Sequence, residues 1–424
     1  MQVLFLLGGK NSRFFPLDSI SHKAMVRIYG KPLLEYTIED FKSIGIKDII
    51  IVIGQTGEVV KEYFGDGSNL GVNIQYALQE EPKGGGNAIL CAKDLINTDF
   101  VMQNPYHIRQ AEILNRMIHR FEEQNLDALI MGQKEENISE FGALVLEGKK
   151  IKGIVEKPEK GQEPSNYKIT STYFFRNEFL EYLEKEEEHE YSFEDAIETF
   201  AKSKEVEMFE DETKESTPLK YAWHLFGIRE LLSQSQEGYR ASGSFVAENA
   251  IVEDSVIIDE GAKVFEGACV KGNTYIGKNA VIGNNAVVRD SDIGAGVSIG
   301  VNSDITRSII MEGTSSHGAG FIGDSVIGPK NKIAAGFITA NKRTDRLNIK
   351  TKIKDQKIDT GINALGVVTG TEVKFGINSS TMPGSLIGEG SQVWPGAIVH
   401  ENLDVFTELK LTQTQEKKSL IKKA

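Results

Sequence analysis

Glycine and basic residues that could hold a phosphate follow the first apolar run of the chain. The segment LGGKNSRFFPL (7–17) places Gly8 and Gly9 ahead of Arg13, and Lys23 lies further along. Glycines allow backbone N–H groups to approach phosphate oxygens, and Arg and Lys side chains supply positive charge. Paired glycines are also common in strand-to-helix turns for steric reasons, so this segment taken alone leaves both interpretations open.

The elements that must position these residues alternate between strand-like and helix-like segments from residue 1 to about 232. Apolar residues at helical spacing, with a glycine at the end, predict a helix over 33–45. Apolar runs predict buried strands at 3–7, 48–54, 72–78, 99–103, 127–132 and 143–148. Near-continuous Val, Ile and Leu strands between helices are typical of an α/β fold with a mostly parallel sheet.

From Phe245 the pattern changes to a repeat of six residues. Aliphatic residues recur at this spacing without a break: Val246, Val252, Ile258, Val264, Val270, Ile276, Ile282 and Val288. Small residues follow most of them, and Gly, Asn and Asp fill the turns. This period is the signature of a parallel β-helix, whose coils stack one aliphatic residue per side in the interior. The pattern slips near Ile293. It then returns at Ile299, Ile305, Ile327, Ile333, Ile377 and Ile387.

Composition excludes several classes of protein. A formal charge of −13 argues against general affinity for nucleic acid or an anionic membrane. Two distant cysteines, Cys91 and Cys269, do not make a disulfide framework and favour a reducing cytoplasm. The start MQVLFLLGG has a short apolar run without a basic lead, so we expect a core strand rather than a signal peptide. No stretch approaches the roughly 20 apolar residues of a membrane span.

Three further segments extend the phosphate-binding pattern: HKAMVRIYGKPLLEYTIEDF (22–41), LQEEPKGGGNAIL (78–90) and GIVEKPEK (153–160). With the first loop, they resemble the sugar-1-phosphate nucleotidylyltransferases, or NDP-sugar pyrophosphorylases, across residues 1–232. In that family a sugar phosphate oxygen attacks the α-phosphorus of a nucleoside triphosphate, and cations neutralise the developing charge.

The resemblance assigns roles to individual residues. It implies that Arg13 and Lys23 hold the triphosphate, and that Lys157 holds the sugar phosphate. It implies that Glu156 binds the sugar hydroxyls. It implies a nucleotide loop made of Gly8, Gly9, Gln79, Gly84 and Gly85, in which Gln79 reads the base. The nucleotide would be UTP or dTTP.

The family also binds Mg²⁺ through two carboxylates, and here neither position carries one. The first is expected at Tyr106, in FVMQNPYHI (100–108), and the second at Leu225. Because Mg²⁺ prefers hard oxygen ligands, Mg²⁺ is a doubtful cofactor and the metal ligands stay unknown. His107 or His224 could bind a softer metal, although a lone histidine is more often an ordinary core or surface residue.

Four segments within about 317–400 carry a second resemblance: SHGAGFIGDSVIG, GFITANKRTD, TGINALGVVTG and INSSTMPGSLIG. They resemble the acetyltransferase half of bifunctional N-acetylglucosamine-1-phosphate uridylyltransferases of archaeal type. The resemblance implies His317 as the base that deprotonates an amino-sugar 1-phosphate, with acetyl-CoA as co-substrate. It implies Asn341 as a sugar or base contact. It implies that Arg343, Lys350 and Lys352 bind phosphate, while a solvated charge run over 349–357 explains the lysines equally well.

Together these patterns predict a Rossmann-like, GT-A-like α/β nucleotidyltransferase domain at 1–232 and a left-handed parallel β-helix of hexapeptide repeats at 245–405. A linker at 233–244 and a polar tail at 406–424 complete the expected organisation. We expect a cytoplasmic homotrimer that makes sugar nucleotides, without nucleic acid or membrane partners. Two alternatives stay open: a catalytically inactive subunit that binds sugar nucleotide and assembles through the β-helix, and a nucleotidylyltransferase that uses no metal or a histidine-bound one.

Overall fold

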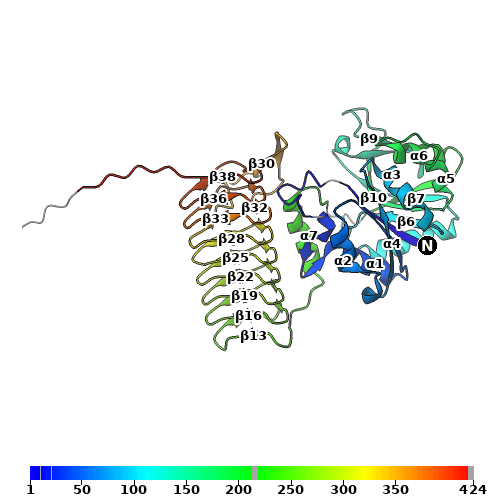
Figure 1. The fold of residues 1–424 in the computed structure, drawn as a ribbon. Helices are drawn as coiled ribbons and strands as arrows, with labels where there is room; N and C mark the ends of the chain where they lie inside the picture. The colour runs from blue at the N-terminus through cyan, green and yellow to red at the C-terminus, as the bar shows by residue number, and fades with distance from the viewer. Residues whose placement is uncertain (10, 21, 213–217, 419–424) are drawn as a thin grey trace, which may run out of the picture. The chain divides into compact units, whose positions relative to one another are not determined.

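The computed structural model describes residues 1–9, 11–20, 22–212 and 218–418. Its contacts divide the chain into two compact units, shown as ribbons in Figure 1. The first unit comprises Met1–Ser12, Ile20–Arg27 and Lys31–Leu219, and the second comprises Arg13–Ser19, Ile28–Gly30 and Lys220–Ala424. Within the described ranges, no helix combines the length and apolarity needed to cross a bilayer.

A nine-stranded sheet forms the centre of the first unit, in the order β5-β4-β1-β6-β10-β7-β11-β9-β8. The strands are β1 (Gln2–Leu7), β4 (Asp48–Ile53), β5 (Asn73–Leu78), β6 (Phe100–Gln103), β7 (Ala128–Lys134), β8 (Gly142–Glu147), β9 (Lys150–Glu156), β10 (Tyr167–Phe175) and β11 (Val206–Glu210). The six predicted strands are therefore confirmed, and the first apolar run is a buried core strand.

The direction of the strands is only partly as expected. β5, β4, β1 and β6 pair in parallel, as do β7 and β11. β10 runs antiparallel to both β6 and β7, and β8 and β9 form an antiparallel hairpin. The expectation of a mostly parallel sheet is wrong for this half, because a short turn between strands forces them antiparallel and apolar composition does not report direction.

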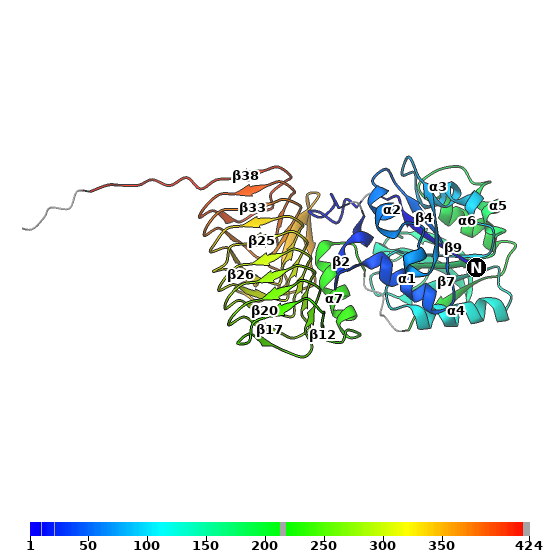
Figure 2. The ribbon, with the colours of Figure 1, turned by 60° about the horizontal axis from the view of Figure 1, so that its bottom comes forward.

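Helices cover both faces of this sheet (Figure 2). On one face, α1 (Leu33–Ser43), α2 (Glu58–Phe64) and α4 (Ala111–Glu123) share a buried cluster with the strands. On the other face, α3 (Gly85–Cys91), α5 (Phe179–Leu183) and α6 (Ser192–Ala201) form a second cluster. Coverage of both faces explains why the central strands are apolar throughout rather than alternating.

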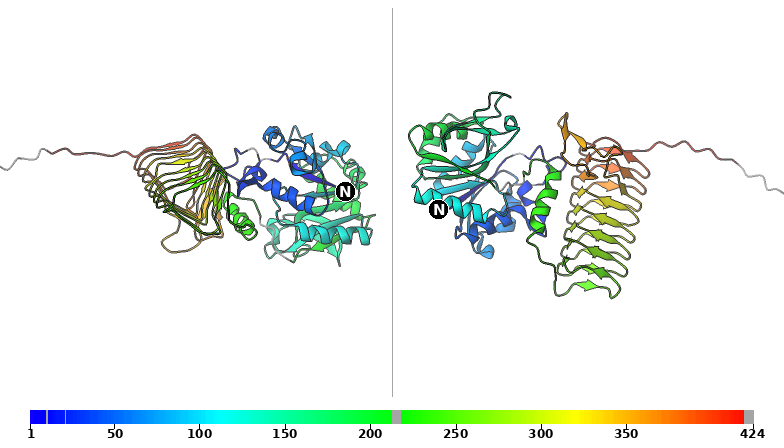
Figure 3. Two further views of the ribbon diagram at one scale, coloured as in Figure 1. Left: turned by 90° about the horizontal axis from the view of Figure 1, so that it is seen from below. Right: turned by 180° about the vertical axis from the view of Figure 1, so that it is seen from behind.

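The second unit is a stack of coils in which each coil adds one strand to each of three parallel sheets (Figure 3). The β12 face consists of β12 (Tyr239–Arg240), β15 (Ile257–Ile258), β18 (Tyr275–Ile276), β21 (Asp292–Ile293), β24 (Ile309–Ile310), β27 (Val326–Ile327), β32 (Val367–Thr369) and β35 (Ser385–Ile387). The β13 face consists of β13 (Phe245–Val246), β16 (Lys263–Val264), β19 (Val281–Ile282), β22 (Ser298–Ile299), β25 (Ser315–Ser316), β28 (Lys332–Ile333), β33 (Lys374–Phe375), β36 (Gln392–Val393) and β38 (Glu408–Leu409). The β14 face consists of β14 (Ile251–Val252), β17 (Cys269–Lys271), β20 (Val287–Arg289), β23 (Asp304–Thr306), β26 (Phe321–Gly323), β29 (Ile338–Thr339), β34 (Ser380–Thr381) and β37 (Ile398–Val399).

The interior of the coils is lined by the repeating aliphatic residues, as the six-residue period predicts. The slip near Ile293 is a shorter coil. Val264 pairs with Ile282, 18 residues on, whereas Ile276 pairs with Ile293, 17 residues on. One residue is therefore missing from one turn, and the interior positions after it stay aligned.

The placement of Ile377 in the interior is wrong. Its side chain is 54% exposed, and Phe375 takes the interior position, where its ring lies 4.2 Å from the Phe337 ring. The cause is an insertion between β29 and β32 that carries the hairpin β30 (Lys350–Ile353) and β31 (Gln356–Asp359). The insertion resets the phase of the repeat, which the six-residue count cannot follow.

The contact-based division differs in detail from the predicted boundaries. The second unit already includes α7 (Leu225–Ser233), and β12 lies inside the expected linker, where it pairs with β15. At the other end, β38 lies inside the expected polar tail and pairs with β36. Backbone pairing extends the coils into polar sequence because ladder hydrogen bonds do not depend on side-chain polarity.

Candidate functional site

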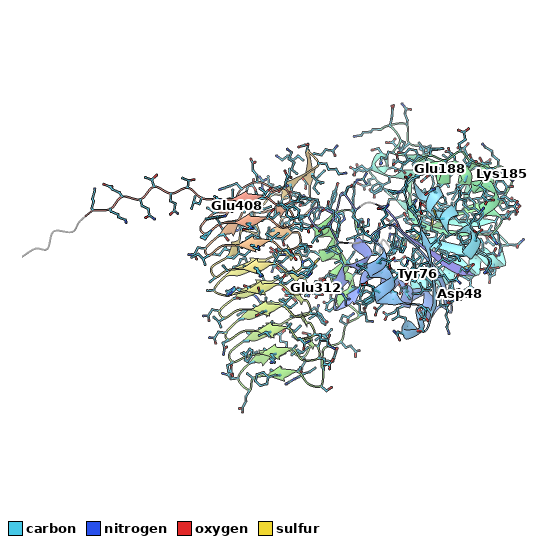
Figure 4. The ribbon with its side chains drawn as sticks, viewed as in Figure 1. Asp48, Tyr76, Lys185, Glu188, Glu312 and Glu408 are labelled. Carbon is cyan, nitrogen blue, oxygen red and sulfur yellow. The ribbon has the colours of Figure 1, made fainter. Side chains whose placement is uncertain are left out.

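A cavity of about 660 Å³ lies beyond the carboxyl ends of β1 and β5 in the first unit. It brings together all the residues predicted for nucleotide binding: Gly8, Gly9, Gln79, Gly84 and Gly85. Lys83 and Glu190 also line it, and the sequence did not single them out. Lys83 lies 3.0 Å from Glu188, whose position is labelled in Figure 4.

Close packing in this cavity explains two of the glycines. A Cβ atom on Gly8 would lie 2.2 Å from Oε1 of Gln79, so only glycine fits beside this buried amide. Gln79 donates through Nε2 to Oδ1 of Asn87 at 2.8 Å and to the Gly84 carbonyl at 3.3 Å. Gly84 has φ +111°, which side chains rarely adopt. These contacts fix the orientation of the Gln79 amide.

The end of β6 carries an aromatic ring and an ammonium group where the resemblance placed a metal carboxylate. Lys23 Nζ lies 4.3 Å from the centroid of the Tyr106 ring, a cation–π contact, and donates to the Leu219 carbonyl at 3.0 Å. Burial raises the pKa of Tyr106 well above its ordinary value, so its hydroxyl stays neutral. The cluster of Lys23, Tyr106 and Leu219 is called the Lys23 cluster below.

The histidines near this cluster are neutral and already bonded. Burial lowers the pKa of His22 to about 3 and that of His107 to about 4, with the charge of Lys23 as a second cause. Nδ1 of His22 accepts from the Ala24 N–H at 3.1 Å, and Nε2 of His107 lies 3.5 Å from the Asn104 amide nitrogen. In the second unit, Nδ1 of His224 accepts from the Lys220 N–H at 3.2 Å. The histidine-bound metal therefore gains no support, since an imidazole lone pair that accepts an N–H is not available to a metal.

The expected Mg²⁺ does not fit these residues. The second expected position, Leu225, is a fully buried apolar residue at the start of α7. Over the described ranges, no three His, Cys, Asp or Glu side chains come together in a way that could hold a metal ion. Mg²⁺ would need at least one anionic oxygen ligand, and Tyr106 and Leu225 supply none.

The predicted sugar-phosphate residues of the first unit lie at the end of β9. Lys157 Nζ lies 3.6 Å from Glu156 Oε1, and both side chains are partly exposed. A Cβ atom on Gly142 would lie 2.7 Å from Glu156 Oε2, so this glycine makes room for the carboxylate. Burial raises the pKa of Glu194 on α6, and the charge of Glu156 adds to this effect. Arg13 is exposed and belongs to the second compact unit, whereas Lys23 belongs to the first.

His317 lies at the edge between the β13 and β14 faces, directly after β25. Its Nδ1 atom lies 3.3 Å from the Ile333 carbonyl of the next coil, and the side chain is exposed. Because a carbonyl only accepts, Nδ1 carries the proton in this contact and Nε2 keeps its lone pair. His317 is therefore held in the tautomer that a general base requires.

Asn341 lies at the opposite edge of the β14 face, where it is fixed by a network that the sequence did not predict. Its Nδ2 atom donates to Asp324 at 2.5 Å. Arg307 grips the same carboxylate with two hydrogen bonds of 2.7 and 2.9 Å. Arg307 and Asp324 occupy the same corner of successive coils with φ of 44° and 47°. A cavity of about 350 Å³ adjoins this pair and reaches Asn363 of the insertion.

The three predicted phosphate-binding cations of the insertion each have an acidic neighbour. Arg343 bonds Asp345, Lys350 lies 3.7 Å from Asp359, and Lys352 lies 2.9 Å from Asp355. All six side chains are substantially exposed. Exposed pairs of this kind contribute little stability, so an incoming phosphate can exchange with the carboxylates.

Two residues of the site carried a signal in the sequence that motif comparison overlooked. Arg307 stands 17 residues before Asp324, which is the coil length of this part of the β-helix. Equivalent corners of adjacent coils lie next to each other, so opposite charges at this spacing predict an ion pair. Lys83 follows Gln79 in the nucleotide loop, where its basic side chain was a further candidate.

Comparison with known proteins places this chain among sugar-nucleotide enzymes. The profile of the family described as Nucleotidyl transferase matches residues 2–228, more than half of the 424. A bifunctional sugar-1-phosphate nucleotidylyltransferase/acetyltransferase of Sulfurisphaera tokodaii is 30% identical over 418 residues, which cover 95% of this chain and 98% of the relative. The bifunctional protein GlmU of Methanococcus maripaludis is 32% identical over 414 residues, and that of Methanocaldococcus jannaschii is 29% identical over 409 residues. These matches cover 95% and 94% of this chain, and 96% and 94% of the relatives. The chain belongs to the Nucleotidyl transferase family, in its bifunctional, archaeal-type branch that joins nucleotidyltransferase and acetyltransferase halves.

Proposed function

We propose that the β-helix half transfers an acetyl group from acetyl-CoA to the amine of an amino-sugar 1-phosphate. His317 removes a proton from the amine through Nε2, the amine nitrogen attacks the thioester carbonyl, and the C–S bond breaks to release the CoA thiol. The observation that carries this proposal is the contact between His317 Nδ1 and the Ile333 carbonyl, because it leaves Nε2 as the acceptor. A positioned base of this kind typically contributes about 10²–10⁴-fold to the rate.

The acceptor would lie along the β14 face, between the edge that carries His317 and the edge that carries Asn341. Asp324 holds the Asn341 amide in one orientation, which suits a specific contact with the sugar. Arg343, Lys350 and Lys352 are the candidates for the sugar phosphate, because an anion can replace their exposed acidic partners.

We further propose that the protein is a homotrimer in the cytoplasm. Apolar side chains project from the β14 face and are about half exposed: Ile251, Ile338 and Ile398. A row of exposed isoleucines on one sheet face suits burial against another copy. Acetyl-CoA would then bind in the groove between copies, and the free Cys91 and Cys269 are compatible with a reducing compartment. Handedness of the coil, expected to be left-handed, is part of the same proposal.

The experiment is a CoA-release assay on the purified full chain with acetyl-CoA and glucosamine 1-phosphate. Glucose 1-phosphate, which has no amine, is the matched control substrate. Thiol release that depends on the amine supports the proposal, and equal rates with both substrates would contradict it.

The first unit, in this account, holds a nucleotide in the cavity formed by Gly8, Gly9, Gln79, Gly84 and Gly85. Nucleotidyl transfer by UTP or dTTP to a sugar 1-phosphate is the activity that the family suggests, with Lys157 and Glu156 at the sugar phosphate. The Lys23 cluster favours a second candidate, in which this half binds sugar nucleotide without forming it, because the expected metal ligands are Tyr106 and Leu225.

A further inference from the structure

The charges around the nucleotide cavity do not match a free triphosphate. Among the described residues that line it, Lys83 is the cation and Glu190 is an anion, and the remaining lining is apolar or uncharged. Lys83 is itself paired with Glu188. A nucleoside triphosphate carries about four negative charges near pH 7, whereas the pyrophosphate of a nucleoside diphosphate sugar carries two. The smaller charge needs less compensation from the protein.

The end of β6 is equally unsuited to a metal–triphosphate complex. The ammonium of Lys23 lies over the Tyr106 ring and donates to the Leu219 carbonyl, so a fixed positive charge stands beside the expected metal position. A dication placed there would be repelled by Lys23 and would meet a neutral phenol instead of a carboxylate. Both features disfavour the complex of Mg²⁺ with UTP or dTTP, and neither disfavours a ligand that binds without a metal.

We propose that the first unit binds a nucleoside diphosphate sugar without a divalent cation, in preference to a metal–triphosphate complex. This inference rests on the proposed binding of a nucleotide in the cavity and names the ligand class. The Lys23 ammonium supplies charge on the protein side that a metal supplies in metal-dependent sites.

The test is isothermal titration calorimetry of the full chain with UDP-N-acetylglucosamine and with UTP, each in 5 mM Mg²⁺ (a typical assay concentration, about 5 mM) and in EDTA. We expect the affinity for UDP-N-acetylglucosamine to agree within about threefold between the two buffers, and to exceed that for UTP with Mg²⁺ by about tenfold. A loss of about tenfold or more in EDTA would overturn the inference and leave the proposed nucleotide site standing. Binding of neither nucleotide in either buffer would overturn both.

Two variants sharpen the result. Tyr106→Asp supplies the carboxylate that the strand end lacks, and Tyr106→Asn removes the ring without adding charge. We expect binding of Mn²⁺ in the presence of UTP, followed by electron paramagnetic resonance, to increase in the Asp variant and to stay at the wild-type level in the Asn variant. Strong Mn²⁺ binding to the wild-type chain with UTP, above that of UTP alone, would contradict the inference without reference to any activity.

Discussion

The Lys23 ammonium lies 4.3 Å from the centroid of the Tyr106 ring and donates to the Leu219 carbonyl at 3.0 Å. This relationship places a protein cation at the end of the strand where the family resemblance implied a metal carboxylate. The glycine-lined cavity of the same unit is nevertheless intact. A nucleotide-binding architecture can therefore persist while the conditions for metal-assisted transfer are absent.

His317→Asn should reduce acetyl transfer by about 10²–10⁴-fold, because the asparagine cannot accept a proton from the amine. The pH profile should change as well, with loss of the acidic limb that reports protonation of the base. CoA release between pH 5 and 9 provides the measurement. Wild-type activity in the variant would exclude His317 as the base.

Gly8→Ala should weaken nucleotide binding by about tenfold or more while the chain stays folded. The new methyl group would lie 2.2 Å from Gln79 Oε1 and must displace that amide. Gly9→Ala is the matched control, because no described atom lies within 4 Å of the corresponding Cβ position. Calorimetry with UDP-N-acetylglucosamine compares the two variants, and equal effects would show that the Gln79 contact is unimportant.

Asp324→Asn should lower the free energy of unfolding by about 1–3 kcal/mol, because the buried carboxylate accepts two bonds from Arg307 and one from Asn341. It should also raise KM for the amino-sugar phosphate by releasing Asn341. Asp345→Asn breaks the exposed pair with Arg343 and should leave the melting temperature unchanged. Urea unfolding with parallel kinetics separates the effects, and a stable Asp324 variant would contradict the network's role.

Asp292 should give the second unit a distinctive pH dependence. Its buried carboxylate accepts from the Tyr29 N–H at 2.6 Å and faces Arg229, and burial raises its pKa from 3.8 to about 6. The folded state therefore holds a proton that the unfolded state has lost between these values, so this group's contribution to stability declines as pH rises from about 4 to 6. The difference amounts to about 3 kcal/mol.

Asp292→Asn should remove that decline, because the amide does not ionise and its oxygen can still accept from Tyr29. Unfolding in urea at pH 4 and pH 7 should show the variant gaining stability relative to the wild type at the higher pH. A wild-type-to-variant difference that is the same at both values would contradict the raised pKa of Asp292.

Much of the fold was accessible from the sequence because it is encoded in local periodicity. The interior of the β-helix follows the six-residue spacing from Ile258 to Val288, and the shorter coil at Ile293 is visible as a change of spacing. Ile377 could not be placed in this way, because a folded insertion changed the phase without leaving a periodic signal. Strand direction in the first sheet was hidden for a related reason: pairing partners are set by turns and tertiary contacts.

The candidate site was predictable where motifs are contiguous and not where contacts join distant residues. The glycines of the cavity and Gln79 come together as predicted. The sequence showed that Tyr106 replaces a carboxylate, but not that Lys23 packs on its ring or that Leu219 receives the ammonium. Those contacts join segments far apart in the chain, and only the fold brings them together.

The most direct test of the account is release of pyrophosphate by the purified wild-type chain. UTP or dTTP would be supplied with N-acetylglucosamine 1-phosphate or glucose 1-phosphate, with Mg²⁺ and with EDTA. The Lys23 cluster predicts no release that depends on Mg²⁺, while UDP-N-acetylglucosamine binds in both buffers. Robust release that requires Mg²⁺ would contradict the account, because it would mean that residues other than Tyr106 and Leu225 bind the metal.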